Sequence, residues 1–91
     1  MNMSKLNIKT PTKVYYQNPS RIVLQNAWEY NWKWQNAYLE VGHKITFKDN
    51  KGNIKTDEVV WFWENKQQIT VMTDKFDNIN PEQIIVIETK E

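Results

Sequence analysis

One stretch in the middle of the chain alternates regularly between aromatic and polar residues. From Trp28 to Trp34 the sequence reads WEYNWKW, so every second side chain is a tryptophan or a tyrosine. Successive side chains of a β-strand point to opposite faces, and this alternation is typical of a strand with one dry face. A helix over residues 20–41 is the competing interpretation, but aromatic and β-branched residues favour a strand.

The alternation changes phase directly after this stretch. At Gln35-Asn36 the apolar positions move from even to odd numbers, and they stay odd from Ala37 to Phe47. We expect either a tight turn at Gln35-Asn36, which would make a hairpin, or a bulge that lets one strand continue. Gly42 would kink the following strand, over residues 39–48.

The remainder of the chain predicts short strands separated by turns. Asp49 to Asn53, DNKGN, is the strongest turn signal. Two apolar runs, VVWFW and IIVIE, are typical of strands that are covered on both faces. Asn80-Pro81-Glu82 predicts one helical turn, because asparagine caps helices and proline favours their first position. The predicted strands cover residues 13–17, 44–48, 54–64, 68–73 and 84–88.

These elements predict an all-β domain, a small antiparallel barrel or roll of five to six strands with one short helical turn before the last strand. An SH3-like barrel is the first choice, since such a turn is a feature of that fold, and an OB-like barrel is the second. Residues 1–12 are expected to be a flexible N-terminal lead-in, and residues 13–91 a single β domain.

Composition excludes several kinds of protein. The chain has no cysteine, so it has no disulfide, thiolate zinc site or cysteine nucleophile. It has no apolar run long enough for a signal peptide or a membrane span, and we expect a cytoplasmic protein. Asn, Ile and Lys make up 31 of the 91 residues. That usage is typical of AT-rich genes and suggests a phage or another mobile element of a low-GC bacterium.

No catalytic or metal-binding pattern stands out. His43 is the only histidine and follows Gly42, so we expect a solvated turn residue without a catalytic role. Asp57 and Glu58 are neighbours in a predicted strand and would point to opposite faces. Residues 74–80 lack the glycine and the terminal glutamate of a calcium loop. We therefore expect no enzyme, no cofactor, no metal and no small-molecule substrate.

The charges divide unevenly along the chain, although the formal net charge is only +1. Residues 1–55 carry nine basic and three acidic side chains, whereas residues 56–91 carry three basic and eight acidic ones. If the two parts form separate faces, the molecule is strongly dipolar. If the strands interleave, neighbouring strands of opposite charge mix the signs.

Aromatic residues are more numerous than a small core can hold. The chain has twelve, and each buries about 150–250 Å² when it is inside. The Trp28–Trp34 alternation could be the inner face of a core strand, yet some rings must still lie at the surface. The predicted partner-binding residues are Tyr15, Trp28, Trp34, Trp61 and Trp63.

Two kinds of partner fit an exposed aromatic surface. One is a protein, or a second copy joined through an edge strand, because Trp and Tyr dominate interface hot spots. The other is single-stranded nucleic acid, whose bases stack on rings. The low net charge favours the protein. The chain is thus predicted to be a small non-enzymatic binding module, an inhibitor or adaptor of a larger host machine. The predicted phosphate contacts of the alternative are Lys33, Lys44, Lys48, Lys51 and Lys55.

Overall fold

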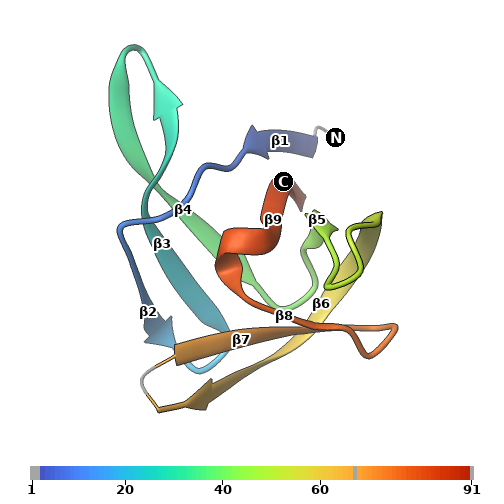
Figure 1. The fold of residues 1–91 in the computed structure, drawn as a ribbon. Coiled ribbons are helices and arrows are strands. Elements are labelled where there is room, and N and C mark those ends of the chain that lie inside the picture. The colour runs from blue at the N-terminus through green and yellow to red at the C-terminus, as the bar shows by residue number, and fades with distance from the viewer. Residues whose placement is uncertain (1–2, 67, 91) are drawn as a thin grey trace.

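The computed structural model describes residues 3–66 and 68–90, which form two antiparallel sheets (Figure 1). The larger sheet has the strand order β1-β9-β5-β6-β7-β8, and the smaller has the order β2-β3-β4. The predicted all-β antiparallel class is confirmed, and so is the helical turn before the last strand. The elements are β1 (Met3–Asn7), β2 (Lys13–Asn18), β3 (Arg21–Tyr30), β4 (Lys33–Glu40), β5 (Lys44–Lys48), β6 (Ile54–Asn65), β7 (Gln68–Thr73), β8 (Asn78–Ile79), the 3₁₀ turn η1 (Pro81–Gln83) and β9 (Ile84–Lys90).

The predicted lead-in contains a strand, which corrects the expectation for residues 3–7. β1 pairs with β9, and Leu6 lies opposite Ile87. The amide of Ile8 then donates to the carbonyl of Ile85 (2.8 Å), and the amide of Lys9 donates to the carbonyl of Ala27 (2.6 Å) in β3. The chain therefore passes here from the larger sheet to the smaller one. Leu6 and Ile8 supply the apolar face that this passage needs.

A second passage between the sheets follows β4. The amide of Val41 donates to the carbonyl of Ser20 in the smaller sheet (3.0 Å), while the amide of Gly42 donates to the carbonyl of Val59 in the larger sheet (2.8 Å). Gly42 has a φ of 101°, in the left-handed region where glycine carries no steric penalty. The chain does bend at Gly42, but residues 39–48 are not the single kinked strand that was expected: β4 ends at Glu40 and β5 begins at Lys44 in the other sheet.

The roll is not hydrogen-bonded into a closed ring, as far as the described residues show. β2 ends the smaller sheet and β8 ends the larger one, and no ladder joins them. A seam therefore runs between β2 and the β6–β7 part of the larger sheet. Gln83 joins η1 to the β5–β6 hairpin, because its Nε2 donates to the carbonyl of Lys48 (2.7 Å) and to Oδ1 of Asn50 (3.2 Å). Its Oε1 accepts from the amide of Asn80 (2.8 Å) and caps η1.

The core is mainly aliphatic, and Phe47 and Phe62 are its buried rings. The large aromatic residues of the surface include four tryptophans, so the predicted surplus of rings at the surface is confirmed. The prediction that both faces of VVWFW are covered was wrong. Trp61 and Trp63 are 45% and 51% exposed, while Phe62 between them is buried, so one face of β6 is largely open. The buried aliphatic core includes Ile22, Leu24, Leu39, Ile45, Val59, Val71, Ile79, Ile84 and Ile87.

Candidate functional site

The aromatic stretch forms a hairpin that projects from the body at the top of Figure 1. Its two turn residues are Asn31 and Trp32, with φ angles of 53° and 65°. Positive φ at both central residues is the mark of a type I′ turn, the connection that matches strand twist best. The turn expected at Gln35-Asn36 is wrong, because Gln35 lies inside β4 opposite Trp28. The alternative, a bulge with one strand running on, fits better: β4 continues through these residues, and the β3–β4 register shifts opposite Asn36, with the extra residues on β3.

The aromatic side chains of this hairpin lie on both of its faces. Glu29 pairs with Trp34, and Tyr30 pairs with Lys33. Residues directly opposite one another in an antiparallel pair share a face. Trp34 therefore lies on the face of Glu29, while Trp28 and Tyr30 occupy the other. The single aromatic face that the alternation predicts is divided by the turn.

A bulge separates the hairpin tip from the rest of the small sheet. The β3–β4 register shifts between Leu24 and Trp28, and Asn26 within the shift has a φ of 56°. Asn36 holds this region: its Oδ1 accepts from the amide of Asn26 (3.1 Å), and its carbonyl accepts from the indole N–H of Trp28 (3.0 Å). Bulges bend a strand and raise its twist, which accounts for the projection of the tip.

The four rings differ in what they contribute. Trp28 is half-buried, packs against the core cluster and lies 5.6 Å from the ring of Tyr30, so it anchors the base. Tyr30 and Trp34 are exposed, and Trp32 at the tip is 92% exposed. We refer to Trp28, Tyr30, Trp32 and Trp34 together as the aromatic hairpin.

Trp32 does not contribute to folding. A non-glycine residue in the left-handed region costs about 1–2 kcal/mol, and a bulky one has no local hydrogen bond to offset it. Its ring is almost wholly in water, so burial offsets none of that cost. Strained and exposed residues of this kind gather at functional sites. Sequence reasoning omitted Trp32 from the site, although Asn31, which tolerates positive φ, marked the turn.

Phe76 repeats this combination in the β7–β8 turn, with a φ of 67° and 81% exposure. Its amide donates to the carbonyl of Thr73 (2.9 Å), which closes the turn. The β7–β8 turn and the aromatic hairpin lie on different sides of the molecule (Figure 1), so they do not form one surface. Sequence reasoning also omitted Phe76, which lies in a segment expected to be a loop.

The other predicted aromatic residues lie away from the hairpin. Tyr15 and Tyr38 stand on either side of Val23 in the cross-strand register and cover this buried side chain. Tyr15 is therefore partly a packing residue. Trp61 and Trp63 are 45% and 51% exposed and belong to β6, on a different sheet from the hairpin. The five predicted partner-binding residues thus do not form a single patch.

Four of the five predicted phosphate contacts are exposed, and the fifth, Lys55, is engaged by two carboxylates. Lys55 Nζ lies 3.0 Å from Asp49 Oδ2 and 3.4 Å from Asp77 Oδ2. Hydrogen bonding to Asp49 raises the pKa of Lys55, and the same contact lowers the pKa of Asp49 to about 2. Lys44 lies in register between Glu58 and Glu88.

The basic first part and the acidic second part of the chain do not form separate faces, because their strands alternate in the larger sheet. Basic residues of the first part of the chain pair across strands with acidic residues of the second part, and this mixes the signs. Of the predicted phosphate contacts, Lys33, Lys44, Lys48 and Lys51 are exposed.

A pocket of about 390 Å³ at the base of the hairpin surrounds His43. The Nδ1 of His43 accepts from the amide of Glu40 (3.2 Å), and Arg21 Nη2 lies 3.3 Å from Glu40 Oε2. Burial lowers the pKa of His43; Glu40 opposes this shift and Arg21 adds to it. His43 therefore stabilises the β4–β5 turn, and the expectation of a solvated residue was wrong, because its side chain is only 18% exposed. The pocket is lined by Leu6, Arg21, Trp28, Asn36, Tyr38, Glu40, His43 and Thr89.

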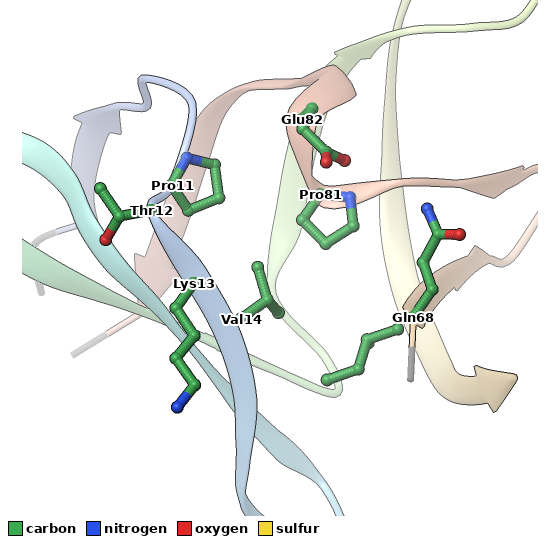
Figure 2. A pocket seen from close by; sticks show the side chains of 8 residues that line it. Pro11, Thr12, Lys13, Val14, Gln68, Pro81 and Glu82 are labelled. Carbon is green, nitrogen blue, oxygen red and sulfur yellow. The ribbon is translucent and has the colours of Figure 1, made fainter. Parts of the chain in front are cut away.

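A second pocket, of about 420 Å³, opens in the seam between β2 and β7 (Figure 2). Pro11 and Pro81 come from its two sides, and the only charged side chains in its lining are Lys13 and Glu82. The lining holds no set of groups that suits acid–base or nucleophilic chemistry. It consists of Pro11, Thr12, Lys13, Val14, Gln68, Ile69, Pro81 and Glu82.

Within residues 3–66 and 68–90, no three His, Cys, Asp or Glu side chains gather so as to hold a metal ion. No helix in those ranges is long and apolar enough to cross a membrane. The chain matches no protein-family model, no curated protein and no solved structure.

Proposed function

We propose that the chain is a non-enzymatic module that binds a protein partner through the aromatic hairpin, as an inhibitor or adaptor of a larger machine. One observation carries the proposal: Trp32 is 92% exposed at the hairpin tip and holds a left-handed backbone conformation that folding does not reward. An exposed tryptophan beside further exposed rings is the composition of an interface hot spot.

The hairpin is preorganised for binding. Its two-residue turn fixes the tip, and Asn36 ties both the bulge and the Trp28 indole in place. A rigid element loses little conformational entropy when it docks, which leaves more of the contact energy for affinity. Tryptophan and tyrosine have few rotatable bonds and add to this advantage.

The charges of the hairpin favour a protein over nucleic acid. Between Trp28 and Gln35 the charged residues are Glu29 and Lys33, so the tip carries no net charge. Binding of single strands combines stacked bases with a positively charged groove. Lys33 is the one basic residue between Trp28 and Gln35, so the hairpin itself supplies a single candidate phosphate contact.

The test compares three versions of the protein as bait in lysate of the host cell: wild type, Trp32→Ala and Trp63→Ala. Trp63 is the matched control, because it is an exposed tryptophan on a different strand. We expect wild type and Trp63→Ala to capture the same protein and Trp32→Ala to lose it by tenfold or more. Equal capture by all three would exclude the hairpin as the binding site.

The nucleic-acid alternative has its own measurement. A labelled single-stranded oligonucleotide is titrated with the wild-type protein at about 50 mM and 200 mM salt. Binding that weakens steeply with salt would favour that alternative, since counterion release governs phosphate contacts. Light scattering of the purified protein separates a heterologous partner from a second copy of the chain.

A further inference from the structure

A groove opens where the end of β2 meets β6, separate from the aromatic hairpin. Its volume is about 450 Å³, within the range of about 300–1,000 Å³ that ligand pockets occupy. One side comes from the smaller sheet and the other from the larger sheet, so the groove is part of the open seam of the roll. It is lined by Tyr16, Asn18, Pro19, Trp61, Phe62 and Glu64.

Rigid rings form the walls and the floor of this groove. Phe62 is buried, and the ring of Tyr16 meets it edge-on, at 6.4 Å between centroids and 81° between planes. Trp61 is 45% exposed on the β6 side, although an aromatic of this size gains most when it is covered. Pro19 adds a further flat apolar surface beside Tyr16 on the β2 side. These surfaces keep their shape without a ligand.

A polyproline II segment has the chemistry that such a groove selects. Proline rings pack between aromatic side chains, and the extended helix has no internal hydrogen bonds, so its carbonyls are free to accept. Three of the lining residues, Tyr16, Trp61 and Asn18, belong to types whose side chains carry hydrogen-bond donors for such carbonyls. The Asn18 side chain is already oriented, since its Oδ1 accepts from the amide of Ser20 (2.9 Å).

The charge of the groove adds one more requirement. Of the six lining residues, Glu64 alone carries a charge. Burial raises the pKa of the Tyr16 hydroxyl, and the negative charge of Glu64 nearby raises it further. A carboxylate at one end of an apolar groove favours a ligand with a basic residue at the matching end.

We propose that the Tyr16–Trp61 groove binds a proline-rich segment of a partner protein, in the polyproline II conformation and with an arginine or lysine beside its prolines. This site is distinct from the aromatic hairpin and takes a different ligand. The protein would then make two contacts at once: its aromatic hairpin would dock on the surface of one partner, and its groove would bind an extended peptide.

The experiment titrates the full chain with synthetic twelve-residue peptides by calorimetry. The first peptide carries two prolines three residues apart and a flanking arginine. The second replaces the prolines with alanines, and the third replaces the arginine with glutamate. We expect saturable binding of the first peptide, at least tenfold weaker binding of the second, and weaker binding of the third by up to about fivefold, the effect of an exposed ion pair.

Variants locate the site. Trp61→Ala should weaken binding of the first peptide at least tenfold, whereas Trp63→Ala, an equally exposed tryptophan outside the groove, should leave it unchanged. Glu64→Gln should remove the preference for arginine over glutamate and leave the proline dependence intact. This second variant keeps the test valid if Trp61→Ala does not fold.

Four results would overturn the proposal: no saturable binding of the first peptide, equal binding of the alanine peptide, equal losses in the Trp61 and Trp63 variants, or an unchanged arginine preference in Glu64→Gln. Trp32→Ala should bind the peptide as wild type does. Failure of the hairpin as a docking site and failure of the groove are therefore seen separately.

Discussion

The indole N–H of Trp28 donates a hydrogen bond to the backbone carbonyl of Asn36, 3.0 Å away across the β3–β4 hairpin. The same ring packs against the core, so Trp28 joins the projecting tip to the body. Trp28→Phe keeps a ring but removes the donor, and we expect it to lower the free energy of unfolding by about 1 kcal/mol. Trp28→Ala should cost about 3 kcal/mol.

Urea denaturation measures both variants of Trp28. Trp34→Ala is the control, because that ring is exposed on the opposite face and should change stability by no more than about 0.5 kcal/mol. If Trp28→Ala costs no more than Trp34→Ala, Trp28 does not anchor the hairpin.

Trp32→Gly should stabilise the protein while it weakens partner binding. Glycine adopts the observed φ of 65° without steric cost, which removes strain of about 1 kcal/mol, less the extra freedom of the unfolded chain. Thermal unfolding should shift upward by a few degrees, since about 1 kcal/mol corresponds to roughly 4–8 °C in a domain of this size.

The matched variant for Trp32→Gly is Trp34→Gly, in the strand, which should lower the melting temperature. A Trp32→Gly protein that melts below wild type would show that the tip is not strained.

Asp49 should make stability depend on acid. Its Oδ2 lies 3.0 Å from Lys55 Nζ, and this contact, with the turn amides, holds its pKa at about 2 in the folded state. A carboxyl with a lowered folded pKa contributes stability above its unfolded pKa and loses it as the pH falls through the folded value. The urea midpoint of wild type should therefore fall between about pH 5 and pH 2.

Asp49→Asn separates the charge from the turn. Asn keeps an oxygen that accepts from the amides of Lys51 and Asn53, which Asp49 Oδ1 binds at 2.9 and 2.8 Å, but it has no charge for Lys55. Its urea midpoint should start lower at pH 7 and change less between pH 5 and pH 2. An equally steep acid dependence in this variant would assign the effect to other carboxyls.

His43 should titrate below its ordinary value of 6.5, because burial disfavours its charged form. It is the only histidine, so its ring protons can be followed by NMR. Arg21→Gln should raise the pKa of His43, and Glu40→Gln should lower it further. A histidine with a lowered folded pKa favours the fold at neutral pH and loses that contribution as the pH falls through the folded value. An observed pKa above 6.5 would contradict the buried position.

The sequence predicts the body of the fold well, and the reasons are local. Residues 44–48 and 68–73 were predicted with the bounds that the structure shows, because each alternates cleanly and is flanked by turn residues. β1 was missed because its short pattern contains few apolar residues and its partner, β9, lies at the other end of the chain. A pairing between strands so far apart in the chain produces no recognisable pattern in the sequence near either strand.

The hairpin shows why the candidate site was only partly predictable. A two-residue turn places even-numbered residues of one strand opposite odd-numbered residues of the next, so the even-numbered rings of Trp28 and Trp34 fall on opposite faces. Unbroken alternation conceals a turn of this kind. Exposure of Trp61 and Trp63 was also beyond local reasoning, because their apolar run resembles a buried strand, and only the sheet arrangement leaves β6 open.

The bulge at Asn26 also bears on how this domain can change. Below it, the ladder from Arg21–Leu24 to Ala37–Glu40 carries the buried side chains of the small sheet, while three of the four rings above it lie in water. Exchanges of sequence between Glu29 and Trp34 leave that ladder and the Trp28 anchor untouched. The domain is thus a natural scaffold for loop grafting, in which recognition can diverge while the framework is preserved.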